Sequence, residues 1–194
     1  MQQSKSKKIK QKSHQKNQIR IIAGSMRGRK ITFPDGRGLR PTLDQVRETL
    51  FNWLAADIPG SICLDLFAGS GALGFEAISR GASSVIMVDA NSKVTDNLKK
   101  NVNNLSIENV KIINQKAKKF LEKNQQLFDL VFLDPPFEKG MLDSITTQIK
   151  PHLSEKALVY VEQENSNSTI DFSDEWKVIK SKKGSRFCYA LIAL

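Results

Sequence analysis

The 194-residue sequence predicts an α/β fold with a mostly parallel, seven-stranded sheet. From residue 61 onward, short apolar runs alternate with stretches whose apolar residues recur at helical spacing, which indicates repeated strand–helix units. A glycine-rich loop follows the first of these strands, where doubly wound sheets bind ligands. The chain ends in two strand-like runs joined by 182–185, which predicts a hairpin and an antiparallel edge strand.

A small basic extension is expected before the sheet. Residues 19–23 and 29–33 have strand character, and the glycine-containing stretch 24–28 between them indicates a hairpin loop. Pro41-Thr42 is expected to open a helix that runs to about residue 56, with an apolar stripe at helical spacing. We therefore divide the chain into a disordered basic tail at 1–18, an extension of a hairpin and a helix at 19–60 and a Rossmann-like domain at 61–194.

Within the Rossmann-like domain, strands and helices alternate until the terminal hairpin. The expected strands lie at 61–66, 84–88, 110–113, 128–133, 158–162, 176–181 and 186–192. The expected helices lie at 72–80, 91–104, about 117–124 and 140–150, where Pro151 stops the last one.

The positive charge is concentrated in the first quarter of the chain. Of the net charge of +10, residues 1–47 hold 13 Lys and Arg against two Asp, whereas residues 48–194 hold 17 Lys and Arg against 18 Asp and Glu. Such a basic arm on a near-neutral body is typical of proteins that bind a polyanion. A tail that only improves solubility is the alternative for residues 1–18, which have six lysines and little to bury.

Composition excludes several classes of protein. No apolar run approaches the ~18 residues of a membrane span, and no apolar region of a secretory signal follows the first lysines. Cys63 and Cys188 are expected to be free thiols in the cytoplasm, and no Cys/His cluster has metal-ligand spacing. We expect a cytoplasmic monomer without a metal.

The glycine loop carries the first functional motif. Gly69 and Gly71 allow a tight turn and close approach of the backbone to a ligand, while Asp65 before them could face a cationic amino-acid group. Asp89, at the end of the next strand, can accept both hydroxyls of a ribose. The loop also matches G-x-G-x-x-G, so an NAD-binding oxidoreductase or nucleotide-binding module stays open. The spacing Asp-x-x-x-Gly-x-Gly resembles the motif of class I S-adenosylmethionine-dependent methyltransferases.

The second motif is Asp134-Pro135-Pro136-Phe137, directly after the apolar strand 128–133. The Asp134 carboxylate and the Pro135 carbonyl can both accept hydrogen bonds from an amino group on a flat ring, and Phe137 can stack on that ring. A Pro-rich turn with Asp134 as its cap is the structural alternative. The motif also permits a DNA adenine- or cytosine-amino methyltransferase.

With these motifs, the sequence closely resembles the RsmD family of bacterial 16S ribosomal RNA guanine-N2 methyltransferases over about residues 19–194. The most diagnostic stretch is Arg40-Pro41-Thr42, followed by Arg47-Glu48-Thr49-Leu50-Phe51-Asn52. The resemblance implies S-adenosylmethionine as the donor and, as the partner, 16S rRNA in the small ribosomal subunit or an assembly intermediate. Lys116 stands where the family often has an acidic residue near the adenine.

The resemblance assigns a role to each candidate residue. The catalytic residues would be Asp134, Pro135, Pro136 and Phe137. The cofactor-binding residues would be Asp65, Phe67, Ala68, Gly69, Gly71, Asp89, Ala90, Lys116 and Ala117. The RNA-binding residues would be Arg20, Arg27, Arg29, Lys30, Arg40, Thr42 and Arg47.

Overall fold

The computed structural model describes residues 17–34, 44–136, 140–164, 175–184 and 187–194. Among them are a separate two-stranded hairpin and a seven-stranded sheet, which confirms the predicted architecture. The strands are β1 (Gln18–Arg20), β2 (Lys30–Thr32), β3 (Ile62–Asp65), β4 (Ser84–Asp89), β5 (Val110–Asn114), β6 (Phe128–Leu133), β7 (Leu153–Glu164), β8 (Lys177–Lys183) and β9 (Phe187–Ala193). The helices are α1 (Asp44–Trp53), α2 (Ala72–Ser79), α3 (Ser92–Leu105), α4 (Ala117–Leu121), α5 (Met141–Ile149) and the 3₁₀ turn η1 (Lys150–His152).

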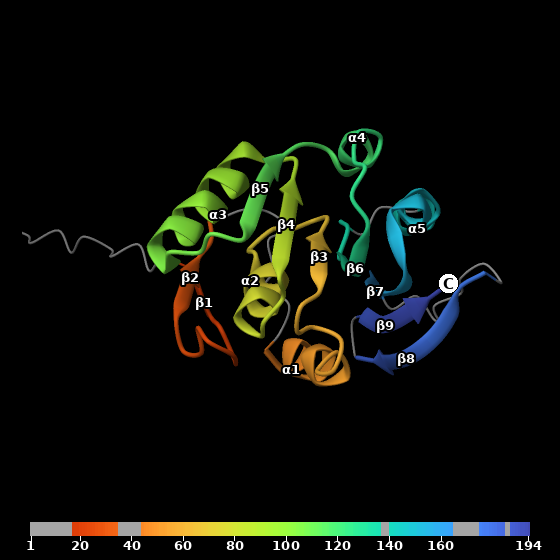
Figure 1. The fold of residues 1–194 in the computed structure, drawn as a ribbon, viewed down its shortest axis with the longest axis horizontal. Coiled ribbons are helices and arrows are strands. Elements are labelled where there is room, and N and C mark those ends of the chain that lie inside the picture. The colour runs from red at the N-terminus through yellow and green to blue at the C-terminus, as the bar shows by residue number, and fades with distance from the viewer. Residues whose placement is uncertain (1–16, 35–43, 137–139, 165–174, 185–186) are drawn as a thin grey trace, which may run out of the picture.

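The seven strands lie in the order β5-β4-β3-β6-β7-β9-β8, which Figure 1 shows from left to right. The pairs from β5 to β7 are parallel, and β9 is antiparallel to both β7 and β8. The chain adds β4 and β5 on one side of β3 and then returns to place β6 on the other side. The topological switch point therefore lies between β3 and β6, where open α/β sheets bind ligands beyond the carboxyl ends of their strands.

Helices cover both faces of the sheet, as Figure 1 shows for α1 and α2 on one side and for α4 and α5 on the other. One buried cluster joins α1, α2, α3 and the N-terminal hairpin to residues such as Phe132 and Tyr160. A second cluster joins α4 and α5 to the opposite face, through residues such as Val131 and Val161. Because side chains alternate along a strand, successive residues of β6 and of β7 belong to different clusters on opposite faces of the sheet. The N-terminal hairpin thus shares its apolar core with the sheet.

The segment after β1 is fastened to the C-terminal half of α2. The amide of Ser25 donates to the carbonyl of Ser79 at 2.7 Å, and the Ser79 hydroxyl donates to the carbonyl of Ala23 at 2.5 Å. Gly24 has a φ of 82°, and a Cβ there would lie 1.8 Å from the Ser79 carbonyl oxygen. Only glycine allows this close approach, so the loop and the helix are held together by backbone contacts.

Several boundaries differ from the prediction; α1, for example, ends at Trp53 and not near residue 56. Two of the differences have a clear structural reason. The stretch that was expected to stop at Pro151 continues as the turn η1, because a proline in the first positions of a helical turn gives up no hydrogen bond. β7 begins at Leu153 instead of residue 158, and its pairing with β6 shifts register after Phe128. The first residues of β7 are mostly polar, so the apolar pattern did not predict a strand there. The Ser154 hydroxyl holds this part of β7 by donating to Asp129 Oδ1 at 2.7 Å.

Candidate active site

The loop that joins β3 to α2 turns on two glycines with positive φ. Gly69 has a φ of 49° and Gly71 a φ of 79°, conformations that glycine adopts without steric strain. A Cβ on Gly71 would lie 2.6 Å from Cδ2 of Leu98 and 2.7 Å from the ring of Phe75. The backbone at Gly71 therefore packs closely against the side chains of Leu98 in α3 and Phe75 in α2, and this contact fixes the loop at the ends of the strands.

Asp65 is the last residue of β3 and is buried beneath this loop. Its Oδ2 accepts a hydrogen bond from the amide of Gly74, at 3.1 Å, in the first turn of α2. Burial raises the pKa of Asp65 to about 7; the bond from Gly74 opposes this rise and the charge of Asp89 adds to it. A cationic group brought next to Asp65 would favour its ionised form, which is the role the sequence predicted.

Asp89 is the last residue of β4 and is only half-buried. Its Oδ2 accepts from the amide of Gly69 at 3.0 Å, and its Oδ1 accepts from the amide of Asn91 at 2.8 Å. These bonds orient the carboxylate next to the glycine loop. Since each carboxylate oxygen has two lone pairs, both oxygens keep capacity for the hydroxyls of a ligand.

The other residues predicted to bind the cofactor lie in the connections after β3, β4 and β5. Ala68 is buried, Phe67 and Ala117 are half-buried, and Ala90 and Lys116 are exposed. Lys116 is the N-cap residue of α4, and its side chain makes no capping hydrogen bond.

The end of β5 contributes two residues that the sequence reasoning missed. The side chain of Asn114 and the amide of Gln115 both donate to the carbonyl of Asp89, each at 3.0 Å. They fasten the ends of β4 and β5 together beside Lys116. The signal was available, because a polar residue ends each parallel strand on this side of the switch point.

Asp134 follows β6 directly, between the ends of β3 and β7 in the sheet. Asp134 is half-buried, Pro135 is buried and Pro136 is exposed. Burial raises the pKa of Asp134 well above its usual range, and the nearby charges of Glu162 and Asp65 raise it further. Phe137, predicted to stack on the substrate, lies outside the described residues.

Three carboxyl groups therefore stand at the carboxyl ends of three neighbouring strands, those of Asp65, Asp89 and Asp134. We call this place the carboxyl edge. Glu162, on β7, brings a fourth acidic group there that the sequence reasoning missed. The signal that could have identified it is its place as an acidic residue at the end of the expected strand 158–162, the fifth parallel strand.

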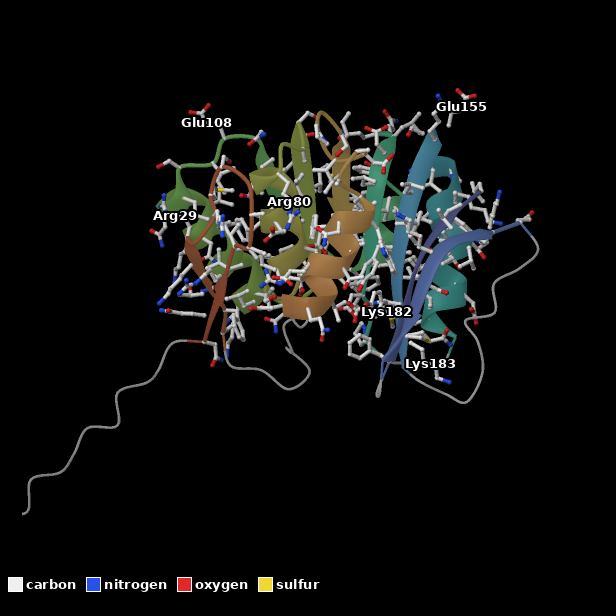
Figure 2. The ribbon with its side chains drawn as sticks, turned by 90° about the horizontal axis from the view of Figure 1, so that it is seen from below. Arg29, Arg80, Glu108, Glu155, Lys182 and Lys183 are labelled. Atoms are coloured by element: carbon white, nitrogen blue, oxygen red, sulfur yellow. The ribbon has the colours of Figure 1, made fainter. Side chains whose placement is uncertain are left out.

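The basic hairpin presents four of the predicted RNA-binding residues to solvent. Arg20, Arg27, Arg29 and Lys30 are all exposed. Arg29 donates to the carbonyl of Asn104, in α3, at 3.2 Å. Figure 2 places Arg29 on the opposite side of the molecule from Lys182 and Lys183 of the terminal hairpin. Two further candidates, Arg40 and Thr42, lie outside the described residues.

Arg47 does not behave as predicted. Its side chain is fully buried, and its Nη2 donates to Asp44 Oδ1 at 2.7 Å and to the carbonyl of Arg20 at 3.0 Å. Its Nη1 lies 3.7 Å from Oε2 of Glu76. The prediction of a direct RNA contact is therefore wrong for Arg47, because its guanidinium joins α1 to the hairpin and to α2 instead of reaching solvent.

Glu76 of α2 is the centre of this buried network, since its side chain has no exposed surface. Its Oε2 accepts from the amide of Ile22 at 2.8 Å, and its Oε1 accepts from the amide of Ala23 at 3.0 Å and from Nε of Arg80 at 2.7 Å. Buried carboxylates are stable only when they are paired in this way. The helix that follows the glycine loop thus also holds the basic hairpin.

Two features are absent from the described part of the chain. Within it, no group of three or more His, Cys, Asp or Glu residues is arranged to hold a metal ion. Over the same residues, no helix has both the length and the apolar character needed to cross a bilayer.

Known proteins resemble the chain over nearly its whole length. The family described as conserved hypothetical protein 95 matches residues 19–193. Ribosomal RNA small subunit methyltransferase D of Escherichia coli strain K12 is 43% identical over 176 residues, which cover 90% of this chain and 89% of that protein. The protein of the same name from Haemophilus influenzae is 44% identical over 191 residues, which cover 95% and 98%. The structure of the putative methyltransferase yhhF from Escherichia coli superposes with a TM-score of 0.84, at 42% identity, over 91% of this chain and 97% of the other.

Proposed function

The chain belongs to the conserved hypothetical protein 95 family, and from this premise we propose that it methylates the N2 amino group of a guanine in 16S ribosomal RNA, with S-adenosylmethionine as the donor. The membership confirms the resemblance to the RsmD family that the motifs indicated. Methylation of the RNA of the small ribosomal subunit is the activity named for its relatives. We further propose that the methylated atom is N2 of a guanine and that the partner is the small ribosomal subunit or an assembly intermediate of it.

The residues at the carboxyl edge fit the donor. Close packing at Gly71 holds the glycine loop at the strand ends, and Asp89 beside it keeps acceptor capacity for ribose hydroxyls. Asp65, whose buried carboxyl resists ionisation, would regain a charge-paired state next to the cationic amino-acid end of the donor. The donor supplies an electrophilic methyl carbon bonded to a positively charged sulfur.

One observation carries the proposal: Asp134 stands at the end of β6, across the switch point from the loop and its two acids. An exocyclic amino nitrogen is a weak nucleophile, because its lone pair is delocalised into the ring. Asp134 and the carbonyl of Pro135 would accept the two N–H hydrogens and aim the lone pair at the methyl carbon. Asp134 would take one proton as the N–C bond forms and the C–S bond breaks, with the electron pair left on sulfur.

The exposed arginines of the hairpin would bind the phosphates around the target base. Guanidinium groups suit phosphate because they present several donors in a fixed plane. We assign Arg20, Arg27, Arg29 and Lys30 to this contact. Phe137 is proposed to stack on the base, which must leave its own stack to reach the carboxyl edge.

The proposal is tested by incubating the protein with radiolabelled S-adenosylmethionine and small ribosomal subunits from cells that lack the enzyme. The RNA is digested and its nucleosides are separated. We expect the label in N2-methylguanosine, and we expect the isosteric variant Asp134→Asn to lose at least about 100-fold in rate. Calorimetry with S-adenosylhomocysteine should give similar affinities for the wild type and this variant.

Three results would contradict the proposal. Label found only in a methylated DNA base would favour a DNA amino-methyltransferase. Equal activity of Asp134→Asn and the wild type would remove the role given to Asp134. Tight NAD binding without a response to S-adenosylhomocysteine would favour an oxidoreductase.

A further inference from the structure

Glu162 lies on β7, two residues before the carboxyl end of that strand. It is a charged residue with only 5% of its surface exposed. No sequence motif pointed to it, and the proposed mechanism does not use it. Its place beside Asp134 nevertheless follows from the strand pairing.

The register of β6 and β7 brings the two acids together. The strands are parallel, with Phe132 opposite Tyr160 and Leu133 opposite Val161. One step further along, Asp134 follows next to Glu162. Because side chains alternate, both acids point to the face that carries Phe132 and Tyr160, which is the face covered by α1.

A buried hydroxyl holds Glu162 in place. Tyr160 Oη donates to Glu162 Oε1 at 2.7 Å, and both residues are buried. The ring of Tyr160 packs against that of Tyr189, at 6.2 Å between centroids, and Tyr189 packs against Trp53 of α1 at 5.5 Å. A hydroxyl that donates to a carboxylate favours its ionised form. The contact also fixes the Glu162 carboxyl at the position next to Asp134 that the strand register sets.

We propose that Glu162 is a positioning residue for methyl transfer, which acts through Asp134 by making it a stronger acceptor for the proton that the amino group loses. The inference rests on the proposed function. When the amino nitrogen bonds to the methyl carbon and the electron pair of the C–S bond goes to sulfur, one N–H proton moves to Asp134. Protonation of Asp134 removes the repulsion between the two neighbouring carboxylates, because the protonated Asp134 can hydrogen-bond to Glu162. The proton passes to solvent after the product has left.

The ionisable groups around Asp134 support this role. The charge of Glu162 is the largest electrostatic cause of the raised pKa of Asp134, and Asp65, on β3, adds to it. Tyr160 faces the pair from β7, and Tyr189 faces Tyr160 from β9. Burial and Glu162 raise the pKa of Tyr160 well above its usual range, so its hydroxyl stays a donor at neutral pH.

The pH dependence of single-turnover methylation tests the inference with Glu162→Gln. A protonated Asp134 cannot accept a proton, so the rate falls below the pKa of Asp134. Removing the neighbouring negative charge lowers that pKa, and we expect the acidic limb of the profile to move down by about one pH unit or more. The high-pH plateau should fall several-fold, because the weaker base accepts the proton less readily.

Glu155→Gln is the matched control. Glu155 is exposed near the start of the same strand, and Figure 2 shows it at the opposite end of the molecule from Lys182 and Lys183. The register places that lysine pair opposite Tyr189 and Cys188, near the carboxyl edge. The control should therefore leave both the limb and the plateau unchanged.

A measurement without cofactor or RNA separates this inference from the proposed function. Carbon-detected NMR of the carboxyl groups should show the titration midpoint of Asp134 falling in Glu162→Gln. If that variant does not fold, Tyr160→Phe should lower the same midpoint, because Glu162 then takes up a proton more readily. The inference would be overturned if the titration midpoint of Asp134 or the acidic limb of the pH–rate profile stayed in place while the rate fell by the same factor at every pH. If the midpoint of Asp134 shifts in the variant but the wild type transfers no methyl group, the proposed function is overturned instead.

Discussion

Glu76→Gln should destabilise the protein strongly, although the two side chains have nearly the same shape. The carboxylate of Glu76 accepts from two backbone amides and from Arg80, and it lies near the buried Arg47. In glutamine, one of the two oxygens becomes an NH₂ group. Whichever way the amide turns, one set of donors then faces another donor.

The magnitude follows from the burial of the network. Removing one partner of a buried ion pair costs about 3–5 kcal/mol, because the remaining charge is left without compensation. Glu76 and Arg47 are both fully buried, so solvent screens little of this loss. For a chain of this size, 1 kcal/mol lowers the melting temperature by roughly 2–4 °C. We therefore expect a decrease of about 6–20 °C.

Thermal unfolding followed by circular dichroism, with urea unfolding as a second measure, gives the value. The exposed Glu108→Gln is the matched control and should change stability by less than about 0.5 kcal/mol. Hydrogen exchange should accelerate at the amides of Ile22 and Ala23, which lose their acceptor. A loss below about 1 kcal/mol for Glu76→Gln, or unchanged exchange at both amides, would refute the reasoning.

Three further predictions concern binding and pH. Charge reversal of Arg27 and Arg29 should weaken RNA binding and flatten its dependence on salt, with cofactor affinity unchanged. The control is Lys156→Glu, at an exposed position next to Glu155, which Figure 2 shows on the other side of the molecule from Arg29; an equal effect there would count against a specific contact. Asp89→Asn should weaken S-adenosylhomocysteine binding at least about tenfold by calorimetry, since the ribose loses an anionic acceptor; an unchanged affinity would remove Asp89 from the site. The native protein binds a proton at Asp65 more tightly than the unfolded chain does, so the cofactor-free protein should lose stability as the pH rises from about 4 to 7, and urea unfolding should show a smaller loss in Asp65→Asn.

The local elements of the fold could be predicted because they depend on residues close together in the chain. The run 128–133 was assigned its strand boundaries correctly, since apolar residues precede an acid and two prolines that end it. The turn at Gly69 and Gly71 was also predictable, because positive φ is a property of glycine itself. Alternation of strands and helices then left few topologies, since parallel strands need crossover connections.

What the sequence could not reveal was the environment of each charged side chain. Arg47 has the same chemistry as the exposed arginines of the hairpin, yet it is buried because α1 and α2 bring it to Asp44 and Glu76. Glu162 looked like any polar residue near a strand end, and only the register of β6 against β7 set it beside Asp134.

The sequence by itself determined the kinds of elements, the motifs and the family to which the chain belongs. The tertiary structure decided which charges are solvated and which are paired in the interior. The physical reason is distance: propensity and periodicity act over a few residues, whereas burial and charge pairing depend on groups that lie far apart in the chain. Glu76, for example, accepts from Ile22 across 54 positions.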